Sequence, residues 1–227
     1  MKNSISFEVE FFCIFVAAMS TPVNKDLIQY VGQEILPRYD HFDAAHQRGH
    51  AEEVMERSLA LAEHYDIDIN MVYAIAAYHD TGLCEGRETH HLASGRIIRE
   101  DPRLREWFDE TQIEMMAQAA EDHRASSGHE PRSIYGKIVA EADRLISPEK
   151  VIRRTIQFGL NHYPELDKEG QYQRFKALMM EKYSDTGYLR LWIPESDNAM
   201  RLEELRRIIR DEKALRTCYE RAWLLVN

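Results

Sequence analysis

His79 and Asp80 are the residues of this chain whose types and position most clearly allow chemistry. They end an otherwise apolar run from Met71 to Tyr78 (MVYAIAAY). Burying an ionisable pair is costly unless a partner compensates for the charge. A divalent metal cation is such a partner, because carboxylates and neutral imidazoles both bind first-row metals. The dyad therefore predicts a metal site at the end of a buried segment.

Two further residues have the type and the helical position of metal ligands. His50 shares one helix face with Val54 and Leu61, and Asp143 shares another with Val139, so both should point inward. Alone, an inward histidine is more often a satisfied core residue, and an inward aspartate is more often a cap or a salt-bridge partner. Together with the dyad, each would be costly to bury without a partner, and one cation would neutralise them together.

The order His50, His79-Asp80, Asp143 resembles the H…HD…D signature of the HD superfamily of metal-dependent phosphohydrolases. The segments GHAEEVMERSLALAEHY, AIAAYHDTGL and KIVAEADRLI resemble the family as well, over roughly residues 40–155. The resemblance implies that these four residues bind metal. It also implies hydrolysis of a small phosphorylated substrate, a phosphomonoester or a phosphoanhydride, with nucleotides among the candidates. The signature specifies the superfamily and not the substrate.

Two more histidines match the subgroups of the superfamily that hold two metals. His90 precedes Ser94-Gly95, similar to the histidine followed by a small pair in HD-GYP phosphodiesterases and HD-type diadenosine tetraphosphate hydrolases. His123, in AAEDHRASSG, resembles the next histidine of those proteins. The GYP motif is absent, which argues against a cyclic-di-GMP phosphodiesterase. The resemblance implies His90 and His123 as ligands of a second ion, with His91 as the alternative to His90.

The chemistry that such ions supply is hydrolytic. A bound cation lowers the pKa of its water and polarises a phosphoryl oxygen, so the resemblance implies His79 and Asp80 at the catalytic centre, with Asp80 bridging two ions. Histidine-plus-carboxylate ligation favours one or two Mn, Fe, Co, Ni or Zn ions over an all-oxygen Mg site. Basic residues near the ligands are candidates to hold phosphate oxygens, although each alone is more often a solvated surface charge. They are Arg87, Arg124, Lys137 and Arg144.

Two other classes of protein fit the same residues. The first is a metal-binding or ligand-sensing HD module without turnover, which phosphate release from a nucleotide panel would distinguish from a hydrolase. The second is a di-iron oxygenase, since some members of the superfamily use such sites for oxygen chemistry. Dependence of turnover on O2 and Fe(II) would identify that class.

Length and composition set the outer limits. The 227 residues allow one large domain with a real core, and 44% hydrophobic and 30% charged residues are ordinary for a globular protein. The net charge of -10 argues against a duplex nucleic-acid partner, which needs a basic face. Three scattered cysteines without a CxxC pair fit reduced thiols in a cytoplasmic protein. The apolar segment 11–19 is too short to span a membrane. We interpret the N-terminal residues as an accessory tail, and the alternatives are a signal peptide or a true start at Met19.

Helical periodicity dominates, so we predict an all-α fold, an HD-like bundle with a C-terminal helical extension. We expect a tail over residues 1–23, a metal-binding helical domain over 24–160, and an extension over 161–227 packed on the same domain. Helices are expected at 24–36, 47–65, 70–79, 90–100, 103–108, 111–122, 133–146, 149–161, 169–183 and 195–225. The last has an apolar stripe suited to core packing or to a homodimer contact: Leu202, Leu205, Ile208 and Ile209.

Overall fold

The computed structural model describes residues 22–43 and 46–226, and all regular secondary structure within these ranges is helical. The predicted all-α fold is therefore confirmed. The predicted tail over residues 1–23 lies, up to residue 21, outside the described ranges. No helix in the described part of the chain is long and apolar enough to cross a membrane. Cys84 and Cys218 are free thiols, and Cys13 falls outside the described residues.

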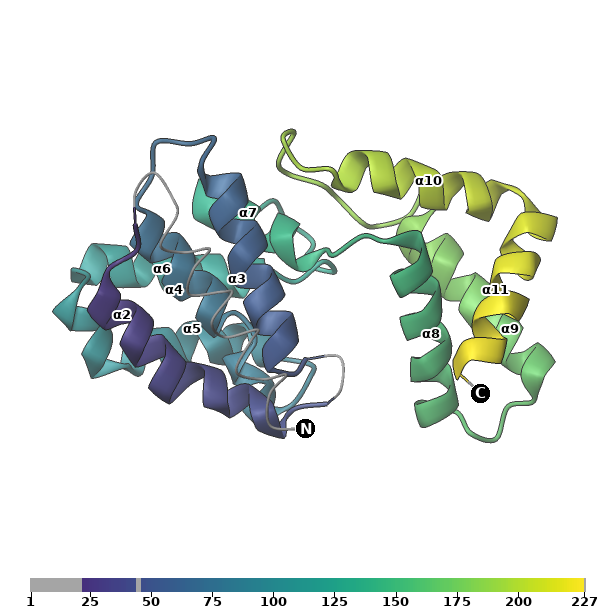
Figure 1. The fold of residues 1–227 in the computed structure, drawn as a ribbon, viewed down its shortest axis with the longest axis horizontal. Coiled ribbons are helices and arrows are strands. Elements are labelled where there is room, and N and C mark those ends of the chain that lie inside the picture. The colour runs from purple at the N-terminus through teal and green to yellow at the C-terminus, as the bar shows by residue number, and fades with distance from the viewer. Residues whose placement is uncertain (1–21, 44–45, 227) are drawn as a thin grey trace. The chain divides into compact units, whose positions relative to one another are not determined.

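The chain divides into two compact units, residues 1–143 and 144–227, and each is described by itself (Figure 1). The first unit contains the predicted metal ligands. Its helical elements are α2 (Lys25–Tyr30), the π-helical turn η1 (Val31–Ile35), the 3-10 turn η2 (Leu36–His41), α3 (Arg48–Ala62), α4 (Ile69–Tyr78), the 3-10 turn η3 (Thr81–Glu85), α5 (His90–Glu100), the 3-10 turn η4 (Pro102–Glu106), α6 (Glu110–Asp122) and α7 (Ile134–Asp143).

α4 forms the centre of the first unit because its residues from Met71 onward are apolar on every face. Every residue from Met71 to Tyr78 is buried, and α3, α6 and α7 pack against this helix. The side chain of Asp68 caps the helix by accepting a hydrogen bond from the Asn70 N–H at 2.9 Å. Burial of apolar surface stabilises the fold by roughly 25 cal/mol per Å². The same burial carries the residues at the C-terminal end of α4 into the interior.

Two differences from the expected helix boundaries have a clear local cause. The helical path that starts at Lys25 continues past Pro37 to His41, because the proline occupies the first turn of η2, where no intrahelical N–H is needed. The single helix expected over residues 195–225 is two helices. Asp211 has an extended backbone, and its side chain accepts hydrogen bonds from the N–H groups of the second and third residues after it, so a new helix starts there.

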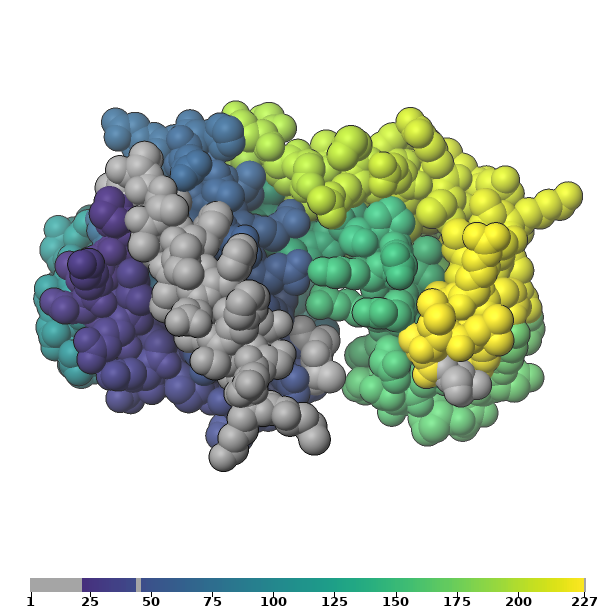
Figure 2. Space-filling model, viewed as in Figure 1, coloured from purple at the N-terminus to yellow at the C-terminus, as the bar shows by residue number. Residues whose placement is uncertain are grey.

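The second unit contains α8 (Pro148–His162), α9 (Lys168–Leu178), the π-helical turn η5 (Met179–Tyr183), α10 (Asn198–Arg210) and α11 (Glu212–Val226). In the space-filling view α10 and α11 form a continuous face of this unit (Figure 2). The unit divides from the first at residue 143 rather than at the predicted residue 160. The reason is that Ile152 and Ile156 of α8 share a core with Phe175 and Tyr219 of the later helices. Packing of the extension on the metal-binding domain stays a prediction.

Candidate metal centre

His79 and Asp80 lie at the C-terminal end of α4, where a buried tyrosine holds their backbone. The Tyr39 hydroxyl donates a hydrogen bond to the Ala77 carbonyl at 2.8 Å and accepts one from the Asp80 N–H at 3.3 Å. Carbonyls in the last turn of a helix have no intrahelical partner, so this hydroxyl satisfies one of them. His79 is fully buried and Asp80 is 3% exposed. The dyad is therefore fixed inside the domain, as the apolar run predicted.

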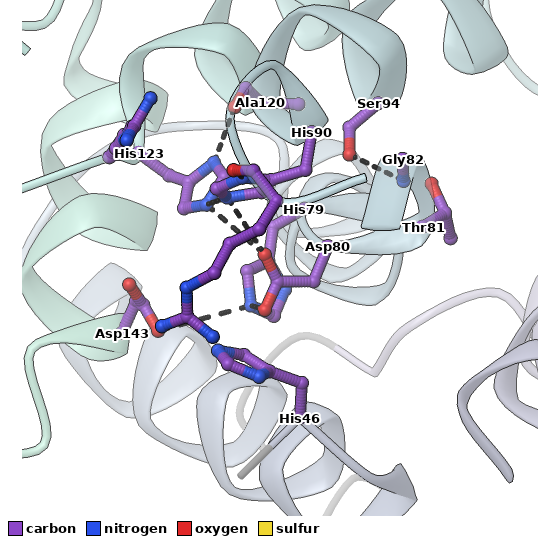
Figure 3. Close-up of polar contacts among 12 residues, drawn as sticks. His46, His79, Asp80, Thr81, Gly82, His90, Ser94, Ala120, His123 and Asp143 are labelled. Atoms are coloured by element: carbon purple, nitrogen blue, oxygen red, sulfur yellow. Dashed lines mark hydrogen bonds and ion pairs between the residues drawn. The ribbon is translucent and has the colours of Figure 1, made fainter. Parts of the chain in front are cut away.

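One oxygen of Asp80 faces a group of ligands that comes from three helices. Asp80 Oδ2 lies 3.2 Å from His79 Nε2 and 3.6 Å from His50 Nε2. The same nitrogen of His50, on α3, lies 3.2 Å from Oδ1 of Asp143, the last residue of α7. Figure 3 shows His79, Asp80 and Asp143 pointing toward one another. The structure thus brings together the four residues of the H…HD…D signature.

The other oxygen of Asp80 faces two further histidines. Asp80 Oδ1 lies 3.3 Å from His90 Nε2 and 3.3 Å from His123 Nε2, and these two nitrogens are 3.2 Å apart. His90 is the first residue of α5 and His123 caps the C-terminus of α6. These two helices pack on each other, which brings the two imidazoles together. One carboxylate therefore lies between two different groups of imidazoles (Figure 3).

Three of these imidazoles are oriented by the same kind of hydrogen bond, from the ring Nδ1 to the backbone carbonyl three residues earlier. The pairs are His79 with Ala76 at 2.7 Å, His90 with Arg87 at 2.8 Å and His123 with Ala120 at 2.6 Å. A neutral imidazole that donates from Nδ1 has its lone pair on Nε2. This bond is the usual way in which proteins orient a metal-binding histidine. All three Nε2 atoms are thus prepared as ligands.

The donor atoms fit a divalent cation. His79 Nε2 and both ring nitrogens of His50 are buried without a hydrogen-bond partner, which is costly for polar atoms. Ligand atoms at about 2.1 Å from one cation lie about 3.0–3.4 Å apart at octahedral and tetrahedral angles, and most of the separations given above fall within that range. Two groups could each hold an ion: His50, His79 and Asp80, and Asp80, His90 and His123. This mixture of imidazole and carboxylate suits transition metals.

The electrostatics of the centre also suit a cation. Burial lowers the pKa of His50, but the carboxylates of Asp143 and Asp80 outweigh burial and raise it to about 9. Burial, together with the charge of His123, lowers the pKa of His90 to about 4, so His90 is neutral near pH 7. A metal requires unprotonated ligands. A cation would therefore displace the proton of His50 and take over its role in neutralising the two carboxylates.

His90 and its neighbour His91 have different surroundings. Their ring centroids are 5.6 Å apart, yet among the described residues the candidate metal groups include His90 and not His91. The geometry therefore favours His90 of the two alternatives that the sequence left open.

Arg87 lies at the rim of the centre, where its side chain approaches the hydrogen-bonded pair of Asp43 and His46. His46 Nδ1 donates to Asp43 Oδ1 at 2.8 Å, and the Arg87 Nη1 lies 3.6 Å from Asp43 Oδ2. The His46 ring packs edge-on against His50, with ring centroids 5.8 Å apart, and Figure 3 places it on the Asp143 side of the site. Sequence reasoning missed Asp43, although its i, i+3 spacing from His46 was a signal for the pair.

The other three predicted phosphate-binding residues already have partners or lie at the unit boundary. Arg124 donates from Nη1 to the Glu88 carbonyl at 2.6 Å. Lys137 forms an ion pair with Glu130 at 2.5 Å. Arg144 is buried and is the first residue of the second unit. Contact of any of them with a substrate stays a prediction.

Gly82 is a structural residue of the centre that the sequence reading missed. A Cβ atom there would lie 2.1 Å from the His90 carbonyl oxygen and 2.5 Å from the Ser94 nitrogen. The Gly82 N–H donates to Ser94 Oγ at 2.9 Å (Figure 3). The backbones of η3 and α5 therefore touch, which brings His90 close to Asp80. The signal in the sequence was a small residue on each side of this contact, Gly82 in η3 and Ser94 in α5.

Comparison with known proteins agrees with this site. Residues 48–147 match the family model of the HD domain, and all six candidate ligands lie within that range. The match supports the resemblance to the HD superfamily over this part of the chain. A crystal structure of a predicted HD superfamily hydrolase from an uncultured Thermotogales bacterium is 20% identical, with a TM-score of 0.46, over 68% of this chain and 86% of that chain. A likeness at that level adds no argument. No curated protein matches the sequence.

Proposed function

We propose that this protein is a metal-dependent phosphohydrolase that cleaves a phosphomonoester or a phosphoanhydride of a small molecule, such as a nucleotide. The observation that carries the proposal is the position of Asp80. One oxygen of its carboxylate faces His50 and His79, and the other faces His90 and His123. A carboxylate placed in this way is suited to bridge two cations, as in two-metal hydrolytic sites.

The roles of the residues follow from the two groups of ligands. His50, His79, Asp80 and Asp143 would hold one ion, and Asp80 would share the second ion with two imidazoles, those of His90 and His123. Divalent transition metals bound there supply an activated water near neutral pH and polarise a phosphoryl oxygen. The protein contributes rigidity, because the buried ligands are held by backbone hydrogen bonds and need little rearrangement.

Arg87 is the residue best placed to bind the substrate phosphate. Its backbone carbonyl holds the ring of His90, so the side chain starts next to the ligands. Its ion pair with Asp43 is exposed on both sides, and such pairs contribute about 0–1 kcal/mol. A phosphate group can therefore compete with Asp43 for the guanidinium, which binds phosphate through two parallel N–H groups.

Replacement of Asp80 tests the proposed function. The experiment measures phosphate release from a panel of nucleotides and phosphomonoesters with Mn²⁺, Co²⁺ or Ni²⁺, for the wild type, Asp80→Asn and the exposed control Asp66→Asn. Asp80→Asn should remove bound metal and lower turnover by about 1000-fold or more, because the metal supplies several kcal/mol of transition-state stabilisation. Asp66→Asn should behave as the wild type.

Three outcomes would contradict the proposal. Full turnover of metal-depleted Asp80→Asn would exclude metal-dependent hydrolysis. Metal binding by the wild type without phosphate release from any substrate would support a sensing module. Turnover that depends on O2 and Fe(II) would support an oxygenase. Circular dichroism of each variant checks that loss of activity is not loss of folding.

A further inference from the structure

The ring of His90 is held in a different way from the rings of His79 and His123. The Nδ1 atoms of His79 and His123 donate to carbonyls within their own helices, α4 and α6. The Nδ1 of His90 donates instead to the carbonyl of Arg87, which lies before the start of α5. The direction of the His90 Nε2 therefore depends on where a loop carbonyl lies.

Core packing does little to fix this loop. All residues from Cys84 to Thr89 are exposed, so burial of apolar surface does not hold the segment. Gly86 has a φ of 107°, a left-handed conformation that glycine adopts without strain. Thr89 precedes α5 without capping it through its side chain. The first-turn N–H groups of a helix have no partner within the helix, and a side-chain cap would have supplied one here.

Arg124 supplies a contact that fixes the loop. Its Nη1 donates to the Glu88 carbonyl at 2.6 Å, and hydrogen bonds from charged donors are stronger than neutral ones. Arg124 directly follows His123 in the chain. The hydrogen bond between Arg124 and Glu88 therefore links the backbone next to His123 with the loop that precedes His90.

The backbone that carries Arg124 is itself anchored. Asp122 is 2% exposed, and its carboxylate accepts hydrogen bonds from the Arg132 backbone N–H at 2.8 Å and from Arg132 Nη2 at 2.9 Å. These bonds close the loop over residues 123–131 at its base. Arg124 thus extends from a fixed end of α6 toward the exposed loop before α5.

We propose that Arg124 is a positioning residue for the second metal ion. By holding the Glu88 carbonyl, Arg124 fixes the position of the neighbouring Arg87 carbonyl. That carbonyl accepts the hydrogen bond from His90 Nδ1 and so orients the ring, whose Nε2 lies 3.2 Å from the Nε2 of His123. The inference rests on the two-ion form of the proposed function. A role limited to phosphate binding would leave metal affinity unchanged in the absence of substrate, so the two roles can be separated.

Titration of the full-length, metal-free protein with Mn²⁺, without substrate, tests the inference. Isothermal titration calorimetry would compare the wild type, Arg124→Gln, Arg124→Lys and the control Arg190→Gln. Arg190 is matched because its Nη1 also donates to a backbone carbonyl at 2.6 Å, that of Gly187 in the second unit. Arg124→Gln should keep the affinity for the first ion and weaken binding of the second by about 10- to 100-fold, the usual effect of losing a contact behind a metal ligand.

The remaining variants and outcomes complete the test. Arg124→Lys keeps a charged donor on a shorter side chain, so its affinity for the second ion should lie between those of the wild type and Arg124→Gln. If Arg124→Gln does not fold, Arg124→Lys takes its place in the comparison. Arg190→Gln should bind both ions as the wild type does. Unchanged affinities in Arg124→Gln, or equal weakening of both ions, would overturn the positioning role and leave the hydrolase proposal standing. A wild type that binds a single ion would overturn this inference and the two-ion form together, while phosphate release would still test hydrolysis.

Discussion

Asp80 is the residue on which both groups of candidate ligands converge. A carboxylate that is 3% exposed would be costly to bury alone. Here it contacts imidazoles of His50 and His79 through one oxygen and of His90 and His123 through the other. The chemical capacity of the site therefore follows from the direction of one side chain, and residue types alone do not specify that direction.

At the residue scale, His90 and His91 form a natural matched pair for a test of the second ion. His90→Gln should lower the affinity for this ion by more than about 100-fold, since loss of a direct ligand exceeds the loss of a supporting contact. His91→Gln should retain it, because His91 lies outside both candidate metal groups. The metal-to-protein ratio after equilibrium dialysis gives the answer. The reverse pattern would identify His91 as the ligand.

At the scale of elements, the site depends on how closely η3 approaches α5. The two elements pack on each other, and the contact has no room for a side chain at Gly82. Helical periodicity predicted α5 over residues 90–100, and the structure has the helix at those residues. It did not predict the contact, because periodicity describes one element and not the distance to its neighbour.

Gly82→Ala should destabilise the first unit. The new Cβ would lie 2.1 Å from the His90 carbonyl oxygen, and relief of such an overlap requires backbone shifts that cost about 1–3 kcal/mol or more. Urea denaturation measures the change in free energy of unfolding. Gly128→Ala is the control, since nothing lies within 4 Å of a Cβ at that position. Equal stability of the two variants would contradict a close contact between η3 and α5.

At the scale of the whole molecule, the candidate ligands lie in one of the two units. All six belong to residues 1–143, whereas residues 144–227 have a core of their own that includes Phe175 and Tyr219. The sequence prediction ended the metal-binding domain at residue 160, after the helix expected over residues 149–161. The structure assigns α8 to the later helices because its apolar residues pack there.

Metal should stabilise the unit that holds the ligands. A ligand present at 100 times its Kd, and bound by the folded state only, raises the free energy of unfolding by about 2.7 kcal/mol per site. Addition of Mn²⁺ to the metal-free protein should therefore raise the melting temperature, and a chelator should reverse the rise. Asp80→Asn should show a much smaller rise. An equal rise in both proteins would indicate that the stabilising ion binds elsewhere.

The sequence by itself determined the all-α fold, the buried α4 and the inward faces of His50 and Asp143, while His90 and His123 became candidate ligands through the resemblance to the HD superfamily. These features depend on residue type and on spacing within single helices, and spacing within a helix fixes which residues share a face. The tertiary structure decided that Asp80 faces imidazoles on both sides, that His90 rather than His91 joins them, and that Arg124 holds the Glu88 carbonyl. These depend on side-chain directions and on contacts between residues far apart in the chain, which no local pattern encodes.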